Sequence, residues 1–594
     1  MVYLETRGPA FNMTAVDTAN SDPVEVPRIR LWRKPLDYVR TQLQEREDQV
    51  FLVLALVIGA LTGLVVVAFI VLTERLGMRL YPVGGARWRR LLFPVAGSLG
   101  IGYLLSRYFP YARGSGVPQT KAALYAREGR ITFRTVFGKF FCTSATLASG
   151  IPLGREGPSV QVGSGLASVL GRNLGLSPER VKALIPVGAA AAIAAAFNTP
   201  LAAVVFALEE IAGDLHAPVI GSVVLASATS WGVLRLLLGN SPLFKVPQYQ
   251  LVHPAEFAIY AVLGVLGGLV SVAFTRLLLG MRERFLRLPL KTQWFQPAAG
   301  GLLVGVLGWF TPQVLGVGYG FVGHALNGSM ALKLMLLLVF LKLITVTVSY
   351  ASGNAGGIFG PALFIGAMLG GSVGTVAHQL FPGHTASSGA YALVGMGTAF
   401  AGIVRAPMTS VLMIFEMTQD YAVIVPLMIS NLVSLFISSR LQPEPIYDAL
   451  AIQDGIHLPG HESRPRTAQR QVMRIMRPAG NLLSAETTVK DALAAMNSPR
   501  NWLVADARGV IGVITRNDLE QAAQDGADKP VADLVNPIHF PHLHSDQGLD
   551  LALDRMGENK LEMLPVVNRA NIHKLEGIVH LQDVLQAYGI HPIP

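Results

Sequence analysis

The feature that most constrains the fold of this chain is an internal repeat of a short glycine-rich segment that contains a proline. The two copies lie 203 residues apart (361 − 158 = 203). Glycine and proline at these positions are typical of a helix start, so two helices are predicted to begin in equivalent places. The copies are Gly154-Arg155-Glu156-Gly157-Pro158 and Gly357-Ile358-Phe359-Gly360-Pro361. Two half-sites are therefore expected to face one ligand, and only the first half-site contains a carboxylate.

The repeat extends over most of the chain. Glycine and proline positions recur in the same order at offsets between 202 (316 − 114) and 207 (407 − 200) residues. The further matched positions are Gly59 and Gly63 with Gly264 and Gly268, Pro94 and Gly97 with Pro297 and Gly300, Gly114 and Gly116 with Gly316 and Gly318, and Pro200 and Glu209 with Pro407 and Glu416. This order indicates a duplicated half. In membranes such duplication commonly places a substrate site between the halves, on broken helices.

Composition places both halves in a membrane. Hydrophobic residues make up 51% of the chain and charged residues only 14%, and long apolar stretches recur from Phe51 to Ser439. The stretch from Phe51 to Leu72 has no charge, which argues against a large soluble helical core. Glycine and proline are frequent inside these stretches, so broken and re-entrant helices are expected where the freed backbone groups are buried in protein.

Charge indicates the orientation. Residues 1–50 are polar and are interpreted as a cytoplasmic arm rather than a cleaved leader. Basic clusters at Arg28 to Arg40, Arg87 to Arg90 and Arg282 to Lys291 are predicted to mark cytoplasmic edges, and they account for much of the net charge of +10 without nucleic acid. The prediction is a multi-pass protein of the cell membrane with both termini in the cytoplasm.

The chemistry-bearing residues do not suggest an enzyme. The single cysteine, Cys142, excludes an intrachain disulfide and most thiolate metal sites. No catalytic nucleophile or metal cluster emerges from the sequence, so catalytic activity is not expected.

The composition changes after Arg440. We predict a transmembrane domain over residues 51–450, with repeats over 51–240 and 256–440, a linker over 451–471 and a soluble α/β domain over 472–594. The soluble domain contains two similar units, 472–526 and 531–590. Each has a β-rich strand after a glycine and then an aspartate that opens an amphipathic helix, a pattern that resembles a pair of CBS modules.

That resemblance implies a regulatory domain that can bind an adenosine nucleotide (ATP, ADP or AMP) between its modules. The residues matching the phosphate and ribose positions are Thr515, Asp518 and Asp583, although His580 stands where a hydroxyl is usual. The alternative is that the aspartates only cap their helices. The domain would then be structural and would stabilise a dimer, and the sequence leaves both interpretations open.

Three segments of the membrane part resemble the CLC chloride channel and transporter family. They are Gly114-Ser115-Gly116-Val117-Pro118, Gly154-Arg155-Glu156-Gly157-Pro158 and Gly356-Gly357-Ile358-Phe359-Gly360-Pro361. The resemblance covers roughly residues 50 to 450 and keeps the motifs in the family's order. It implies an all-α inverted-repeat membrane fold with broken and re-entrant helices, followed by a cytoplasmic CBS pair, and a homodimer in which each subunit has its own pathway.

Helix starts of this kind favour an anion, because free N–H groups and the helix dipole converge there. A cation transporter would instead need intramembrane carboxylates grouped together, and here they are spread out. The family pattern implies that chloride binds the amides of Ile358 and Phe359 and the hydroxyls of Ser115 and Tyr447. Ser115 could instead cap a helix, and Tyr447 could be an interfacial anchor. The remaining anion-loop residues are Gly114, Gly116, Pro118, Gly154, Arg155, Gly157, Pro158, Gly357, Gly360 and Pro361.

Two glutamates are the candidates for proton transfer. Glu156 is expected to occupy an anion position when ionised and to swing away when protonated; the alternative is an ion pair with Arg155 or Lys139. The resemblance implies that Glu210 relays protons from the cytoplasm, as an acid here is typical of the family's exchangers; the alternative is a solvated charge at a helix end. Its neighbour Glu209 recurs as Glu416, which suggests a structural role for that pair.

The sequence therefore predicts a chloride/proton antiporter in the lipid bilayer with a regulatory CBS domain. The alternative is a passive chloride channel regulated by its CBS tail. A membrane-anchored nucleotide sensor without transport is disfavoured, because it leaves the paired helix starts unexplained.

Overall fold

The computed structural model describes residues 47–456, without 83, 214–218, 240, 241, 245, 248 and 250, and residues 458 and 471–590, without 479, 481, 496–500, 538, 539, 546, 570 and 589. Most of the predicted arm, including the basic cluster from Arg28 to Arg40, and most of the predicted linker lie outside the described residues. The chain divides into two units, Met1–Ile456 and His457–Pro594. Each unit is described by itself.

The regular structure in the described residues of the first unit is helical. Within the described residues, seven helices are long and apolar enough to cross a membrane, which agrees with the prediction of a multi-pass protein. They are Val50–Leu80, Pro178–Phe197, Ile220–Leu238, Glu256–Leu286, Leu332–Ala351, Phe359–Leu380 and Tyr421–Gln453.

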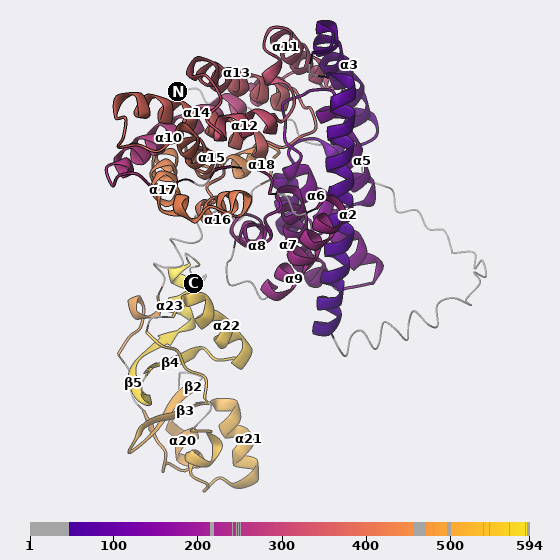
Figure 1. The fold of residues 1–594 in the computed structure, drawn as a ribbon. Coiled ribbons are helices and arrows are strands. Elements are labelled where there is room, and N and C mark those ends of the chain that lie inside the picture. Colours follow the sequence, from indigo (N-terminus) through magenta and orange to yellow (C-terminus); the bar gives the residue numbers. More distant parts are fainter. Residues whose placement is uncertain are drawn as a thin grey trace, which may run out of the picture. The chain divides into compact units, whose positions relative to one another are not determined.

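The helices of the first repeat, indigo to magenta in Figure 1, begin four residues before the predicted boundary at 51. Their bounds are α2 Glu47–Leu80, α3 Arg87–Arg107, α4 Val117–Ala126, α5 Phe133–Ala148, α6 Glu156–Asn173, α7 Pro178–Phe197, α8 Pro200–Phe206, the π-helical turn η2 Ala207–Ala212, and α9 Ile220–Leu238.

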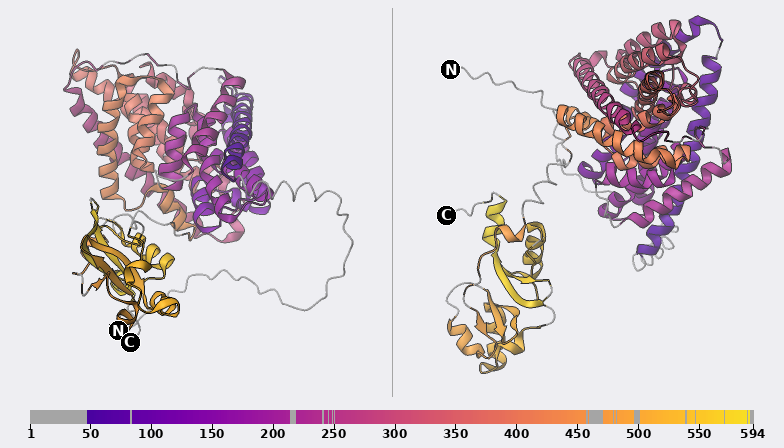
Figure 2. Two further views of the ribbon diagram at one scale, coloured as in Figure 1. Left: turned by 90° about the horizontal axis from the view of Figure 1, so that it is seen from below. Right: turned by 60° about the vertical axis from the view of Figure 1, so that its left-hand side comes forward.

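The second repeat, pink to orange in Figure 1, follows the same order, and Figure 2 shows the two sets of helices as adjoining groups. A last short helix, α18, ends at Gln453, three residues beyond the predicted boundary at 450. The bounds are α10 Glu256–Leu286, α11 Gln296–Phe310, α12 Tyr319–Leu326, α13 Leu332–Ala351, α14 Phe359–Leu380, α15 Ser388–Val404, α16 Pro407–Thr418, α17 Ile424–Leu441 and α18 Ile446–Gln453.

Glycines at matched positions let helices of each repeat pack closely. A Cβ atom on Gly188 of α7 would lie 2.3 Å from the carbonyl oxygen of Gly163 on α6. A Cβ on Gly366 of α14 would lie 2.2 Å from the carbonyl oxygen of Gly395 on α15. Because small residues allow such backbone contact in membrane helices, the same pair of helices is packed by the same device in both halves.

The prediction of broken helices is confirmed. Among the described residues of the first unit, five helices have only seven to twelve residues, too few to cross a bilayer: α4, α8, α12, α16 and α18. Helices α6 and α14 begin at Glu156 and Phe359, which are both fully buried. Pro158 and Pro361 stand in the first turns, where proline removes no intrahelical hydrogen bond. The unit therefore contains helix ends in its interior, where a ligand can meet them.

The second unit is α/β and contains two similar modules. In the first module, β1 pairs parallel with β2, and β2 pairs antiparallel with β3. In the second module, β4 pairs antiparallel with β5, and Leu543 forms a parallel bridge to Val566 that corresponds to β1. The bounds are β1 Leu483–Ser484, α20 Val489–Ala495, β2 Asn501–Asp506, β3 Gly509–Thr515, α21 Arg516–Gly526, α22 Leu549–Asn559, β4 Met563–Asn568, β5 Asn571–His580 and α23 Leu581–Ala587.

Candidate functional site

The starts of α6 and α14 are joined to each other. Gly154 donates its N–H to the carbonyl of Gly357, and Gly357 donates to the carbonyl of Gly154, each over 2.7 Å. The two residues form an isolated antiparallel bridge, which is the pairing that a local two-fold axis between the halves would produce. The structure thus brings together the two segments that the sequence repeat singled out.

The Glu156 carboxylate lies across this junction. It is fully buried; its Oε2 accepts a hydrogen bond of 3.3 Å from the N–H of Gly360 in the first turn of α14, and its Oε1 accepts one from the Tyr319 hydroxyl. A negative charge is stabilised at such a helix start by the free amides and the dipole. The carboxylate therefore occupies a place suited to an anion.

The alternative ion pairs considered for Glu156 are not formed. Arg155 Nη1 lies 3.0 Å from Glu74 Oε1. The Lys139 ammonium donates to the carbonyl oxygens of Ala112 and Gly114 at 3.1 and 2.6 Å. Both interpretations of Glu156 as a partner of these cations are therefore wrong.

Two buried hydroxyls lie near the junction. Within the part of the chain that the structure describes, Ser115 Oγ and the Tyr447 hydroxyl have no hydrogen-bond partner, and their residues are 0% and 1% exposed. The N-cap of α4 is Gly116, so the interpretation of Ser115 as the cap is wrong. Tyr447 lies in the first turn of α18 and is buried, so it is not an interfacial anchor. Unpaired buried donors are costly unless a ligand accepts from them.

The segment Gly114–Pro118, which we call the Ser115 loop, packs against the start of α6. Gly116 has φ of +103°, and a Cβ there would lie 2.3 Å from the carbonyl oxygen of Gly157. A Cβ on Gly157 would lie 2.6 Å from the carbonyl oxygen of Ser115. The close approach therefore requires glycine on both sides, and it fixes the hydroxyl of Ser115 beside the joined helix starts.

Ile358 and Phe359 are both fully buried at the start of α14. Phe359 is the first residue of the helix, so its amide has no intrahelical acceptor. Its ring is fixed by the rings of Phe400 and Phe197, with centroids 4.3 and 4.8 Å away. The structure thus brings the predicted anion-binding residues of the three segments together with Glu156.

A matched pair of lysines holds the loops before α4 and α12. Lys342 on α13 repeats the contacts of Lys139 on α5: it donates to the carbonyls of Val314 and Gly316 at 3.1 and 2.6 Å. Sequence reasoning missed Lys342, although its offset from Lys139 of 203 residues (342 − 139) is that of the helix starts. The ammonium groups fix backbone rather than bind carboxylates.

Glu209 and Glu416 cap each other's helices. Glu209 accepts from the N–H groups of Met408 and Thr409 at the start of α16, at 3.3 and 2.8 Å. Glu416 on α16 accepts from the N–H groups of Leu201 and Ala202 at the start of α8, at 3.0 and 2.7 Å. The structural role expected for this pair is confirmed.

Glu210 lies in η2 and is 8% exposed, so the interpretation as a solvated helix-end charge is wrong. Its Oε1 lies 2.9 Å from the Lys121 ammonium, which also lies 2.6 Å from Asp448 Oδ1. Sequence reasoning did not identify Lys121 or Asp448 as partners. The one available signal was their position in motif segments, since Lys121 follows the Gly114–Pro118 loop and Asp448 follows Tyr447.

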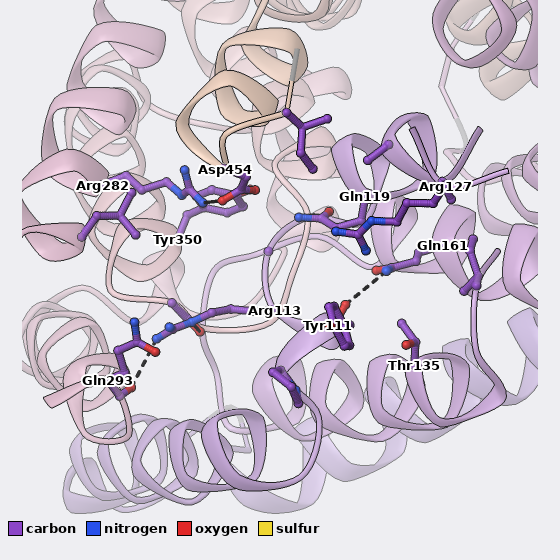
Figure 3. Close-up of a pocket in the computed structure, with 18 of the residues that line it drawn as sticks. Tyr111, Arg113, Gln119, Arg127, Thr135, Gln161, Arg282, Gln293, Tyr350 and Asp454 are labelled. Carbon is purple, nitrogen blue, oxygen red and sulfur yellow. Dashed lines mark hydrogen bonds and ion pairs between the residues drawn. The ribbon is translucent and has the colours of Figure 1, made fainter. Parts of the chain in front are cut away.

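A cavity of about 510 Å³ adjoins the Ser115 loop (Figure 3). It is lined by Gly114 and by Tyr350, whose hydroxyl accepts from the Ser115 N–H at 3.3 Å. Arg113 on its wall donates to backbone carbonyls, including that of Gln293 at 3.2 Å. Arg127, Arg130, Arg282 and Asp454 also line it, so its lining has an excess of positive charge.

In the second unit, Thr515 and Asp518 bind each other in a capping box at the start of α21. Thr515 Oγ1 donates to Asp518 Oδ2 over 2.6 Å, and the Asp518 N–H donates back over 3.2 Å. Asp583 Oδ1 accepts from Arg477, while its buried Oδ2 has no partner in the described part of the chain. The structure thus gives Thr515 and Asp518 the capping role and leaves one acceptor open on Asp583.

The fold and the site define a class: a multi-pass ion-transport protein of duplicated design with an appended α/β unit. A family model described as "Voltage gated chloride channel" matches residues 97–439, and the CBS domain model matches residues 472–525 and 531–589. The chain therefore belongs to the voltage-gated chloride channel family, also known as CLC, and contains a CBS pair.

Relatives agree with this assignment. The H(+)/Cl(-) exchange transporter ClcA of Salmonella arizonae is 33% identical over 472 residues, which cover 76% of this chain and 98% of the relative. The structure of a slow cyanobacterial Cl-/H+ antiporter matches with a TM-score of 0.63 at 28% identity and covers 68% of this chain and 97% of that one. The structure of a eukaryotic CLC transporter matches in fold over 93% of this chain, with a TM-score of 0.58 at 20% identity.

Proposed function

We propose that this protein is a chloride/proton antiporter. The observation that supports it most directly is the Glu156 carboxylate, which lies on the start of α14 and accepts the Gly360 N–H. A group in this position competes with an anion when it is ionised and vacates the position when it is protonated. The relatives named as H(+)/Cl(-) exchange transporters support the same function.

In the proposed mechanism, chloride is held by the amides of Ile358 and Phe359 and by the hydroxyls of Ser115 and Tyr447. These donors select an anion without a full positive charge, so the ion can also leave. Protonation of Glu156 releases its carboxylate from the start of α14 and admits chloride. We assign proton exchange with the cytoplasm to Glu210, a buried acid whose carboxylate pairs with Lys121.

Flux measurements on purified protein in liposomes test the proposal. A chloride gradient is imposed, and proton movement is recorded against an opposing proton gradient. Uphill proton movement is the expected result. Chloride flux without coupled protons would overturn the antiporter and leave a passive chloride channel regulated by its CBS tail, with Glu156 as a gate alone.

We further propose a homodimer in the cell membrane with both termini in the cytoplasm. Large apolar side chains are exposed on the surfaces of α8, α16 and α17, including Leu201 at 59%, Met408 at 53% and Phe436 at 60%. Such a surface needs lipid or a second copy to cover it. Cysteine introduced at these positions should cross-link two copies in native membranes. Cysteines that form no cross-link and react only with lipid-soluble reagents would show that lipid covers this surface, which would contradict the dimer.

We also propose the CBS unit as the place where an adenosine nucleotide acts on transport. The open acceptor Oδ2 of Asp583 suits a ribose hydroxyl, which is a donor. Binding of ATP, ADP or AMP to the full-length protein should be weakened by Asp583→Asn. No binding of any of the three would leave the CBS pair with a structural role that stabilises a dimer.

A further inference from the structure

Three charged side chains from three separate elements meet around Glu210. Lys121 comes from α4, Glu210 from η2 and Asp448 from α18. The ammonium lies between the carboxylates, 2.9 Å from Glu210 Oε1 and 2.6 Å from Asp448 Oδ1. The side chains of Lys121, Glu210 and Asp448 are only 11%, 9% and 12% exposed. We refer to these residues as the Lys121 cluster.

The charges of the cluster do not balance when all three groups are ionised. Two carboxylates and one ammonium give a net charge of −1 in a buried place. An unpaired buried charge is costly, and groups in such surroundings shift their protonation to avoid it. The cluster therefore favours taking up one proton, which makes it neutral.

Asp448 determines in which protonation states of the cluster the Lys121 ammonium keeps a carboxylate partner. When Glu210 is protonated, Asp448 remains as the counter-ion of Lys121, so the protonated cluster still has its charges paired. Without Asp448, protonation of Glu210 would leave a buried ammonium with no partner, at the large cost of breaking a buried pair. Asp448 thus allows Glu210 to gain and lose a proton while Lys121 stays charged.

We propose that Lys121 and Asp448 are positioning residues for proton exchange at Glu210, with Asp448 as the fixed counter-ion that keeps Lys121 paired in both states of Glu210. The inference rests on the proposed antiport function, in which Glu210 handles the proton. It adds two residues of this chain to the proton path and assigns them opposite effects on Glu210.

Other charged and titratable groups face the cluster. Glu209 precedes Glu210 in η2, but its carboxylate accepts a hydrogen bond from the Thr409 N–H at the start of α16. Tyr447 precedes Asp448 on α18, and its hydroxyl lies within electrostatic reach of Glu210 and Glu156.

Arg405 interacts electrostatically with Asp448 and Glu444. The Tyr125 hydroxyl donates to the carbonyl of Ala212 at the end of η2 over 2.6 Å. These groups are present in every variant below, so the differences among the variants report on the cluster itself.

The test is the pH dependence of chloride-driven proton transport by the full-length protein in liposomes. Asp448→Asn leaves Lys121 with Glu210 as its sole carboxylate partner in the cluster, so Glu210 stays ionised to lower pH. The half-maximal pH of proton transport should fall by about one unit or more. Lys121→Met leaves two neighbouring carboxylates, which favour sharing a proton, and the half-maximal pH should rise by a similar amount.

Two controls sharpen the comparison. Lys121→Arg keeps the positive charge, so its pH profile should stay close to that of the unsubstituted protein. The double variant K121M/D448N removes one charge of each sign and should lie between the single variants. Shifts of the same sign in D448N and K121M, or no shift in either, would overturn the inference.

The outcome separates this inference from the proposed function. Absence of uphill proton transport in the unsubstituted protein would overturn antiport itself. Uphill transport that Glu210→Gln abolishes, with pH profiles unmoved in both cluster variants, would overturn the cluster alone. Infrared titration compares the unsubstituted protein with E210Q: the protonated carboxyl band of the cluster should be present in the unsubstituted protein and absent in E210Q, and its persistence in E210Q would place the proton on Asp448 and overturn the inference.

Discussion

Gly154 and Gly357 exchange two backbone hydrogen bonds of 2.7 Å, one in each direction. Because these residues precede α6 and α14, the exchange fixes the distance between the two helix starts. Glu156, two residues after Gly154, is thereby placed so that its carboxylate reaches the first turn of α14. The position of the proposed gate is therefore set by backbone and not by an ion pair.

Replacing Gly154 with alanine should displace the Glu156 carboxylate. A Cβ on Gly154 would lie 2.3 Å from Glu156 Oε2, which is the end of a side chain and can move, and 3.1 Å from the backbone nitrogen of Gly360, which must shift slightly. The variant should fold and conduct chloride, with fewer protons moved per chloride. The measurement is the proton-to-chloride ratio in liposomes. Gly100→Ala is the matched control, since a Cβ there meets nothing within 4 Å. A proton-to-chloride ratio in G154A equal to that of the unsubstituted protein would contradict the expected displacement of the carboxylate.

Glu156→Ala should leave chloride flux intact and abolish proton coupling. The change removes the carboxylate that competes for the start of α14 and also the group that takes the proton. Chloride efflux and proton uptake are recorded on the same liposomes. Glu179→Ala, which removes an exposed acid from the first turn of α7, serves as the control and should keep coupling. Proton pumping retained in E156A would show that Glu156 is not the gate.

The sequence predicted the positions that a repeat or a motif identifies, because helix starts and turns depend on local residues such as Gly154 and Pro158. It could not predict the partners of Glu210, since Lys121 and Asp448 lie 89 and 238 residues away (210 − 121; 448 − 210) and meet it only through packing of three helical elements.

Tyr319 was missed for the same reason. Its hydroxyl donates to Glu156 from the second repeat, and no residue type or spacing in the sequence predicts that contact. Lys342 was the one predictable omission, because the repeat relates it to Lys139.

Glu210→Val should uncouple protons without blocking chloride. Valine cannot take a proton, while Lys121 keeps Asp448 at 2.6 Å as its partner, so the substitution leaves no unpaired ammonium. Uphill proton movement under a chloride gradient is the measurement, with chloride flux as the check on folding. Unchanged coupling would return Glu210 to a structural role.

Glu209 and Glu416 cap each other's helices, and removing either carboxylate should lower the melting temperature of the protein without a matching loss of transport rate. Glu416→Ala frees two N–H groups at the start of α8, and Glu209→Ala frees two N–H groups and the Thr409 hydroxyl at the start of α16. Loss of a helix cap costs about 0.5–2 kcal/mol, so both variants should melt at lower temperature in detergent.

Glu209→Ala should be the more destabilised of the two, because it loses three acceptor contacts and Glu416→Ala loses two. Glutamine at either position keeps a carbonyl oxygen as acceptor and should recover much of the loss. Chloride flux per folded molecule and the proton-to-chloride ratio should stay near those of the unsubstituted protein in every variant. An unchanged melting temperature in both alanine variants would mean that the mutual capping adds nothing to stability, and a lost proton-to-chloride ratio would give Glu209 a part in proton transfer.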